Sequence, residues 1–193
     1  MGCIRLCDSG KVELSNLNRQ ILYSDADIGE EKIRSAIRAL RQINPHVQIV
    51  GLNLHINSGT VADLVADSDI MVDCLDNFET RYVLNKHAVA NSLPLVHAGV
   101  YGMAGQISFL YPPHTPCLRC IFPESPSKEV FPVLGSTAGM IGCLEALETV
   151  KYLTGLGGLL KNRLLIWEGD LARFEEVKIG RDPACPICAK KQG

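Results

Sequence analysis

The first half of the chain alternates between two spacings of apolar residues. Short apolar runs that are typical of strands occupy residues 3–7, 47–54, 70–74 and 95–100. Residues 30–44 instead repeat apolar side chains with the period of an amphipathic helix, which ends before Pro45. Helices are also expected over residues 60–66 and 79–91. This alternation predicts a parallel sheet with helices packed on its faces.

The second half of the chain has a different pattern. Strands are expected over residues 106–111, 164–167 and 174–179, and a long helix over residues 137–153. The short spacing of the last two strands is typical of a hairpin, so we expect antiparallel pairing at one edge of the sheet. Since no repeat, low-complexity tract or linker interrupts the chain, the sequence predicts one α/β domain over residues 1–193, with a mostly parallel sheet and antiparallel edge strands.

Composition and charge indicate a globular protein and argue against a nucleic-acid-binding or membrane protein. A chain of 193 residues with 47% hydrophobic and 21% charged residues has ordinary globular composition and can bury a substantial core. The formal net charge of −2 provides no electrostatic attraction to nucleic acid or to an anionic membrane. No apolar run is long enough to cross a bilayer, and the first residues lack a signal-peptide pattern. We therefore expect a cytoplasmic protein that binds neither nucleic acid nor membrane.

Two Cys-x-x-Cys pairs predict a metal site. Cys117 and Cys120 lie in a proline-rich turn in mid-chain, and Cys185 and Cys188 lie in a second one near the C-terminus. Two such pairs can complete the tetrahedral four-sulfur site of structural zinc. The alternative is two unrelated redox pairs or buried thiols. We expect one structural Zn²⁺, which would tie the C-terminal tail to the middle of the chain.

The remaining cysteines lie within apolar stretches, and we expect them to be small buried residues: Cys3, Cys7, Cys74 and Cys143. Eight cysteines without an export signal favour a reducing compartment, where thiols bind metals or fill cores. The five histidines have no metal-ligand spacing. We interpret His97 as a core residue or one that supports a site residue, rather than as a catalyst, and Trp167 as an aromatic of the core or of a dimer interface.

Acidic residues follow two of the predicted strands. In open α/β sheets ligands bind beyond the carboxyl ends of the strands, where Asp8 could accept hydrogen bonds from ribose and Asp76 could hold Mg²⁺. Arg19 and Lys32, at a loop and a helix start, could bind phosphate. Each residue, taken alone, also has an explanation without a ligand. Asp8 could cap a turn, Asp76 could cap a helix, and Arg19 and Lys32 could be solvated surface charges. Their combination favours a nucleotide site.

The segment of residues 8–20, with Ser15-Asn16-Leu17-Asn18-Arg19-Gln20 at its end, resembles a signature of the ubiquitin-activating-enzyme-like superfamily. The bacterial members of this superfamily include the MoeB, ThiF and HesA-type adenylyltransferases. Further parts of the resemblance occur in the same order and spacing, namely Lys32, residues 43–45, residues 73–77, residues 105–106 and both cysteine pairs. The resemblance extends over essentially the whole chain and implies a Rossmann-like sheet.

The resemblance also implies roles for individual residues. Asp8 would bind the ATP ribose, and Asp76 would hold Mg²⁺. The donors around the triphosphate would be Asn16, Arg19, Gln20 and Lys32, and the catalytic residues would be Arg19, Lys32 and Asp76. The implied reaction is adenylylation, by ATP, of the C-terminal Gly-Gly of a ubiquitin-like sulfur carrier in molybdopterin, thiamine or related metabolism. Positioning and charge stabilisation would suffice for this chemistry, and a homodimer is implied.

The chain departs from the family pattern in three places. The opening strand, the Gly-rich turn and the helix after them are not in the sequence, so we expect residues 1–193 alone to bind ATP poorly. Gly10 stands where relatives have a second acid, which would loosen the turn. Residues 124–135, where thiol-using relatives carry a cysteine, contain none; Ser136 lies near that position and Cys143 lies further on, within a helix.

Two alternatives to an adenylyltransferase stay open at this point. One is a catalytically inactive, zinc-stabilised scaffold that binds the carrier or a homologue. The other is a dinucleotide-dependent oxidoreductase with the same sheet, which is disfavoured because Arg19, Lys32 and the four-cysteine site would have no role in it.

Overall fold

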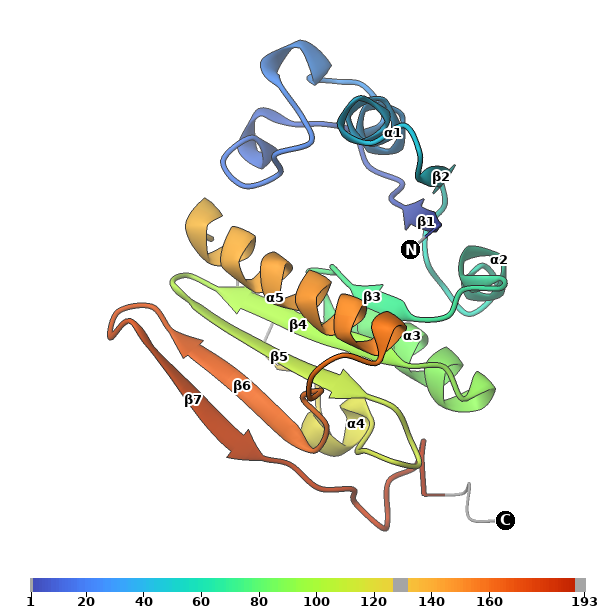
Figure 1. Cartoon of the computed structure of the whole chain (residues 1–193), viewed down its shortest axis with the longest axis vertical. Coiled ribbons are helices and arrows are strands. Elements are labelled where there is room, and N and C mark those ends of the chain that lie inside the picture. Colours follow the sequence, from blue (N-terminus) through green and yellow to red (C-terminus); the bar gives the residue numbers. More distant parts are fainter. Residues whose placement is uncertain (1, 127–131, 190–193) are drawn as a thin grey trace. The chain divides into compact units, whose positions relative to one another are not determined.

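The computed structural model describes residues 2–126 and 132–189 and divides into two compact units, Met1–Ser68 and Asp69–Gly193 (Figure 1). We call these the N-terminal unit and the C-terminal unit, and each contains its own sheet. The single domain expected over residues 1–193 stays a prediction.

The N-terminal unit is built on two parallel strands. β1 (Cys3–Cys7) pairs with β2 (Gln48–Leu52) over their full lengths. α1 (Lys32–Ile43) connects the two strands, and α2 (Val61–Val65) follows them. Two short 3-10 turns, η1 (Leu14–Asn16) and η2 (Asp25–Asp27), shape the long loop between β1 and α1. The predicted strand–helix–strand alternation is confirmed here.

The packing of α1 on β2 depends on a glycine. A Cβ added at Gly51 would lie 2.4 Å from Ile37 Cδ1 and 2.6 Å from Ile33 Cγ2, so only a residue without a side chain fits beneath the helix. Ile33 is buried, as the amphipathic pattern predicts, whereas Ile43 at the last turn is 74% exposed. The apolar stripe therefore faces the sheet at the start of the helix and leaves it at the end.

The C-terminal unit contains a five-stranded sheet in the order β3-β4-β5-β6-β7. Its strands are β3 (Met71–Asp73), β4 (Leu95–Tyr101), β5 (Ala104–Leu110), β6 (Arg163–Glu168) and β7 (Arg173–Lys178). β3 and β4 are parallel, while the other neighbours are antiparallel, including the predicted hairpin of the last two strands. Two of the five strand pairings in the described residues are parallel, so the fold is mixed α/β.

In the described residues of the C-terminal unit the helices are α3 (Phe78–Asn91), the short α4 (Leu118–Ile121) and the long α5 (Gly135–Thr154). α5 runs along β4 and β5 (Figure 1), where Ile141 occupies the space that a side chain on Gly105 would need. The core beneath α5 contains the fully buried residues Val96, Ile107 and Phe109. No helix in the described part of the chain is long and apolar enough to cross a membrane.

The cysteines outside the two pairs are less buried than expected. Cys3, Cys74 and Cys143 are exposed, and Cys7 is half-buried, so the prediction that all four fill the core was wrong. In α5, Cys143 follows the buried Ile141 by two residues, which places it on another side of the helix. Apolar neighbours in the sequence were therefore not sufficient to make these cysteines buried.

Candidate functional site

Asp8 and Lys32, both predicted to contact nucleotide, lie close together at the carboxyl end of β1. Lys32 Nζ is 3.7 Å from Asp8 Oδ2, and the backbone N–H of Gly10 donates to Asp8 Oδ1 at 2.7 Å. The N–H of Lys32 donates to the Gly10 carbonyl at 3.0 Å, which fixes the start of α1 beside this turn. The backbone of Gly10 thus helps to close the turn. The Asp8 carboxylate and the Lys32 ammonium therefore lie side by side just beyond β1.

The predicted phosphate-binding segment forms a compact turn around η1. Asn16 is buried, and its Oδ1 accepts from the N–H of Glu13 at 3.0 Å, so its amide oxygen shapes the turn. Arg19 Nη1 donates to the Ser15 carbonyl at 3.1 Å and to Asn18 Oδ1 at 2.9 Å. Gln20 Oε1 is buried and makes no hydrogen bond to any described residue. The three predicted donors therefore lie within one turn, and Gln20 Oε1 has no hydrogen-bond partner among the described residues.

A second turn, which the sequence analysis missed, supports this loop. The N–H and Oγ of Ser24 both donate to Asp27 Oδ2 at 2.7 Å, and Arg38 of α1 pairs with both Asp27 and Glu30. These interactions, chiefly the hydrogen bonds from Ser24, lower the pKa of Asp27 to about 2. The spacing of Ser24 and Asp27 at the start of a short helical turn resembles a capping box and could have been recognised in the sequence.

Asp76 follows β3 in the C-terminal unit, and its carboxylate is exposed. The alternative for this residue was a helix cap. That task belongs instead to Asn77, whose Oδ1 accepts from the N–H of Thr80 at 2.9 Å. Asp76 Oδ1 accepts only a surface hydrogen bond from Asn77 Nδ2 at 3.2 Å among the contacts of the described residues. Its carboxylate is therefore available to a cation.

A buried polar cluster, which was also missed, lies next to this turn. Asp73, Arg81 and His97 are all buried. Asp73 Oδ2 lies 2.7 Å from His97 Nδ1 and 3.2 Å from Arg81 Nε. His97 is thus a core residue, as expected, but one with a carboxylate partner. Arg81 gave little signal in the sequence, because a lone arginine within a helix normally lies at the surface.

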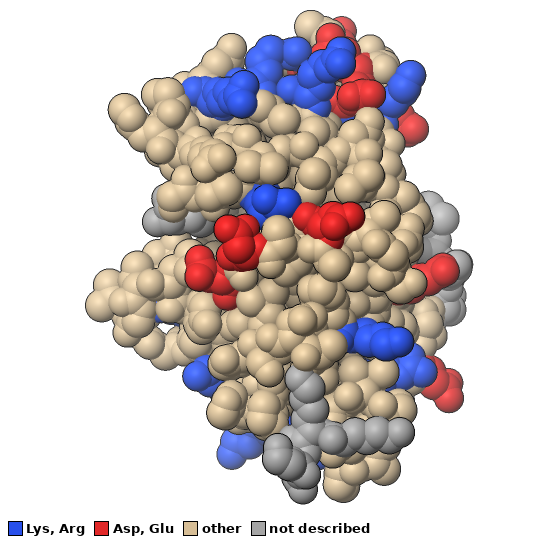
Figure 2. Space-filling view, turned by 90° about the vertical axis from the view of Figure 1, so that its right-hand side faces the viewer, with Lys and Arg blue, Asp and Glu red and all other residues tan. Residues whose placement is uncertain are grey.

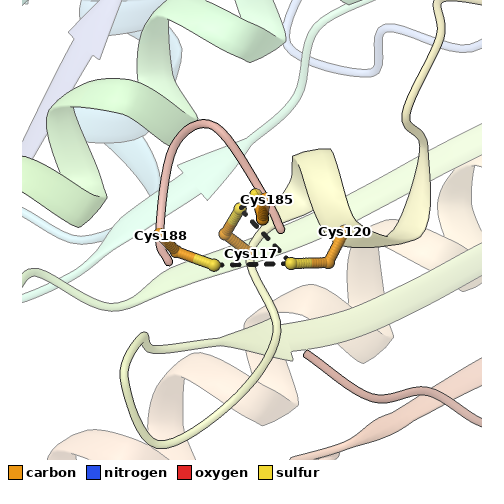
Figure 3. A group of neighbouring side chains, drawn as sticks. All are labelled: Cys117, Cys120, Cys185 and Cys188. Carbon is orange, nitrogen blue, oxygen red and sulfur yellow. Dashed lines mark hydrogen bonds between the residues drawn. The ribbon is translucent and has the colours of Figure 1, made fainter. Parts of the chain in front are cut away.

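The four paired cysteines come together in the C-terminal unit, as predicted (Figure 3). Their sulfur atoms all lie within 4.8 Å of one another. The separations are 3.9 Å for Cys117–Cys120, 3.7 Å for Cys117–Cys185 and 3.4 Å for Cys120–Cys188. A tetrahedral zinc ion with bonds of about 2.3 Å to sulfur would require separations of roughly 3.8 Å. The cluster can therefore hold a metal ion, and the alternative of two unrelated pairs is wrong.

Local structure explains how the two cysteine turns form. The N–H of Cys120 donates to the carbonyl of Cys117 at 3.0 Å, and Asn85 Oδ1 of α3 accepts from the N–H of Leu118 at 2.8 Å. Burial raises the pKa of the Cys120 thiol to about 11, and it also raises the pKa of the Cys117 thiol. A bound cation would supply the charge that favours thiolates here.

The segment where thiol-using relatives carry a cysteine lies partly outside the described residues, which omit residues 127–131. Ser136 lies in the first turn of α5, and Cys143 lies within the same helix. Figure 2 shows one face of the molecule, on which basic and acidic side chains are interspersed.

Comparisons with known proteins identify the family and the fold of the chain. The model of the ThiF family matches residues 1–187. The SAMP-activating enzyme E1 of Haloferax volcanii is 38% identical over 196 residues, which cover 98% of this chain and 72% of that protein. The molybdopterin-synthase adenylyltransferase of Escherichia coli is 37% identical over 195 residues, which cover 98% of this chain and 78% of that protein. The crystal structure of E. coli MccB with ATP has a TM-score of 0.87 at 24% identity, covers 97% of this chain and 59% of the MccB chain, and shows a similar fold.

Proposed function

Because the chain belongs to the ThiF family, we propose that it catalyses ATP-dependent adenylylation of the C-terminal glycine of a ubiquitin-like sulfur-carrier protein. Relatives that share more than a third of its residues are named as an adenylyltransferase and as an activating enzyme. The observation that best supports the proposal is the approach of Lys32 Nζ to within 3.7 Å of Asp8 at the carboxyl end of β1. The carboxylate that would accept from ribose and the cation that would bind phosphate are thereby adjacent.

In the proposed reaction, the carrier's terminal carboxylate attacks the α-phosphorus of ATP. A bond forms between a carboxylate oxygen and phosphorus, the bond from phosphorus to the bridging oxygen breaks, and pyrophosphate leaves. The products are an acyl-adenylate and pyrophosphate, without a protein nucleophile. The protein's contribution is therefore to align the reactants and to offset negative charge.

Each site residue has a task in this scheme. Asp8 would accept a hydrogen bond from a ribose hydroxyl, and Lys32 and Arg19 would neutralise phosphate charge. Asn16 and Gln20 would donate to phosphate through their amide nitrogens, since Asn16 Oδ1 is already used within the turn. Asp76 would hold Mg²⁺, which would offset the charge that develops on the leaving pyrophosphate.

We further propose that the four-cysteine cluster holds structural zinc, and that the protein acts in the cytoplasm as a homodimer. The arrangement of four sulfurs, three of them on buried cysteines, fits a structural ion, which needs no open coordination position. The carrier would belong to molybdopterin, thiamine or a related sulfur-transfer pathway.

ATP–pyrophosphate exchange tests the proposed function directly. We expect exchange that depends on a carrier ending in Gly-Gly, measured by incorporation of labelled pyrophosphate into ATP. The matched control is the same carrier without its last glycine, which should give no exchange. Carrier binding without any exchange, in zinc-loaded protein, would contradict the proposal and favour a non-catalytic scaffold.

A further inference from the structure

The turn that carries Asp76 is held at the residue directly before it. The N–H of Leu75 donates to Asp73 Oδ1 at 3.1 Å, and the carbonyl of Leu75 accepts from Arg81 Nη2. Both backbone polar groups of Leu75 are thus bound by buried charged side chains. Since the peptide unit is planar, holding the Leu75 carbonyl also fixes the nitrogen and Cα of Asp76.

Arg81 connects three elements through one guanidinium group. Nη2 also donates to the Ala98 carbonyl of β4 at 2.9 Å, while Nε lies 3.2 Å from Asp73 Oδ2 at the end of β3. The guanidinium lies over the Phe78 ring at the start of α3, 5.1 Å from its centroid. Its side chain is only 9% exposed. The planar fork of an arginine suits several fixed acceptors at once, which a lysine ammonium does not reproduce.

The turn at Leu75 is held by more hydrogen bonds than the start of α3 requires. Asn77 already caps α3 by accepting from the N–H of Thr80. The bond from Arg81 to Leu75 instead holds the backbone from which the exposed Asp76 side chain extends. Mg²⁺ demands nearly ideal octahedral geometry and tolerates little displacement of its ligands.

We propose that Arg81 is a positioning residue, which holds the Asp76 carboxylate where magnesium bound to the nucleotide requires it. This inference rests on the proposed function. Arg81 would touch neither nucleotide nor metal, and would act through the Leu75 carbonyl. A merely structural arginine would affect stability without changing the response to Mg²⁺.

The principal variant is Arg81→Lys, which keeps the buried positive charge but loses the planar fork. A second variant, Arg81→Gln combined with Asp73→Asn, removes both charges and so leaves no unpaired buried charge. The matched control is Arg163→Lys. Arg163 likewise donates to a backbone carbonyl, that of Leu159 at 3.0 Å, and to a carboxylate, that of Glu176 at 2.8 Å, but on β6.

The first measurement is ATP–pyrophosphate exchange at increasing Mg²⁺ concentration in the full chain. For Arg81→Lys we expect the half-saturating Mg²⁺ concentration to rise about tenfold, with the rate largely restored at saturating Mg²⁺. Arg163→Lys should leave it unchanged. An unchanged Mg²⁺ response in folded Arg81→Lys protein would overturn the proposal.

The second measurement is amide hydrogen exchange, which requires no activity. Amides of residues 74–77 should exchange faster in both Arg81 variants, while those of α5 should keep their wild-type rates. Uniform acceleration in the whole C-terminal unit, or failure of both variants to fold, would contradict the proposal, because Arg81 would then stabilise the fold in general.

The two proposals can fail separately. Wild-type protein that gives no carrier-dependent exchange would contradict the proposed adenylylation. The hydrogen-exchange comparison would still decide whether Arg81 holds the turn before Asp76.

Discussion

At the scale of single residues, Asp76 and Asn77 divide two tasks that adjacent polar residues could share. Asn77 satisfies the N–H of Thr80 at the start of α3, so the helix does not need the neighbouring carboxylate. Asp76 remains exposed directly after a strand. Because Asn77 caps the helix and Asp76 does not, we propose that Asp76 binds a cation rather than stabilising the helix.

In a version of the protein that also contains the family's opening strand and Gly-rich turn, replacing Asp76 with Ala is expected to abolish ATP–pyrophosphate exchange, because the metal would lose its protein ligand. Arg19→Ala should have a comparable effect through the loss of a phosphate contact. The control is Asp63→Ala, at an acid in the first turn of α2. Exchange within a few-fold of wild type in either site variant would refute the assignment of that residue.

Glu145 provides a prediction about pH. It is buried in α5, and burial, followed by the Asp73 carboxylate, raises its pKa to about 8. A carboxyl group with a raised folded-state pKa contributes stability that is fully present below its unfolded pKa and is lost as pH rises through the folded value. Wild-type stability should therefore decline, through this group, as pH rises from the ordinary carboxyl pKa of 4.5 to the folded-state pKa of about 8.

The variant Glu145→Gln cannot ionise, so it should become more stable relative to wild type as pH rises. We expect a difference on the order of 2 kcal/mol in the free energy of unfolding between pH 6 and pH 9, since each unit of pKa shift corresponds to roughly 1.4 kcal/mol. Denaturant unfolding of both proteins at these pH values measures it. If the variant exceeded wild type in free energy of unfolding by the same amount at pH 6 and at pH 9, Glu145 would not titrate as proposed.

At the scale of elements, the contact between α1 and β2 places Lys32 beside Asp8. Lys32 is the first residue of α1, and the helix can approach the strand because Gly51 has no side chain. The same contact that builds the small core of the N-terminal unit therefore also sets the candidate nucleotide site.

Gly51→Ala should destabilise the N-terminal unit, because its Cβ would lie 2.4 Å from Ile37 Cδ1. Overpacking of this kind costs about 1–3 kcal/mol, which thermal unfolding would reveal. Gly139→Ala is the matched control: its Cβ would meet nothing within 4 Å, and alanine in a helix interior is favoured over glycine by up to about 1 kcal/mol. Equal melting temperatures for Gly51→Ala and wild type would contradict the packing argument.

Local patterns predicted the elements well and their tertiary partners less well. The first strand was predicted with the bounds that β1 has, and the helix expected over residues 30–44 is Lys32–Ile43. Both rest on near-neighbour periodicity. The exposure of Cys74 and the burial of Arg81 depend instead on packing between distant segments. Arg81 is buried because Asp73 and the Ala98 carbonyl compensate its charge, and neither partner is evident from its neighbours in sequence.

At the scale of the whole molecule, the four-cysteine cluster joins segments that are far apart in sequence. Cys117 and Cys185 are separated by 68 positions, and their sulfurs lie 3.7 Å apart. The tail is also held by the N–H of Asp182, which donates to Cys120 Sγ at 3.4 Å, and by Arg181, which donates to the Cys188 carbonyl. These contacts converge on the sulfur cluster, so a metal there would stabilise a long loop closure.

The purified protein is therefore expected to contain one tightly bound zinc per chain, and Cys185→Ser should lose it. Because metal binding at a structural site contributes to folding free energy, the variant should also unfold at a lower temperature. Metal analysis and thermal unfolding measure the two effects, with Cys143→Ser as the control, since that cysteine is exposed and outside the cluster. Well under one equivalent of zinc in wild-type protein, with all four thiols open to alkylation in the native state, would show that these sulfurs lie together without a metal.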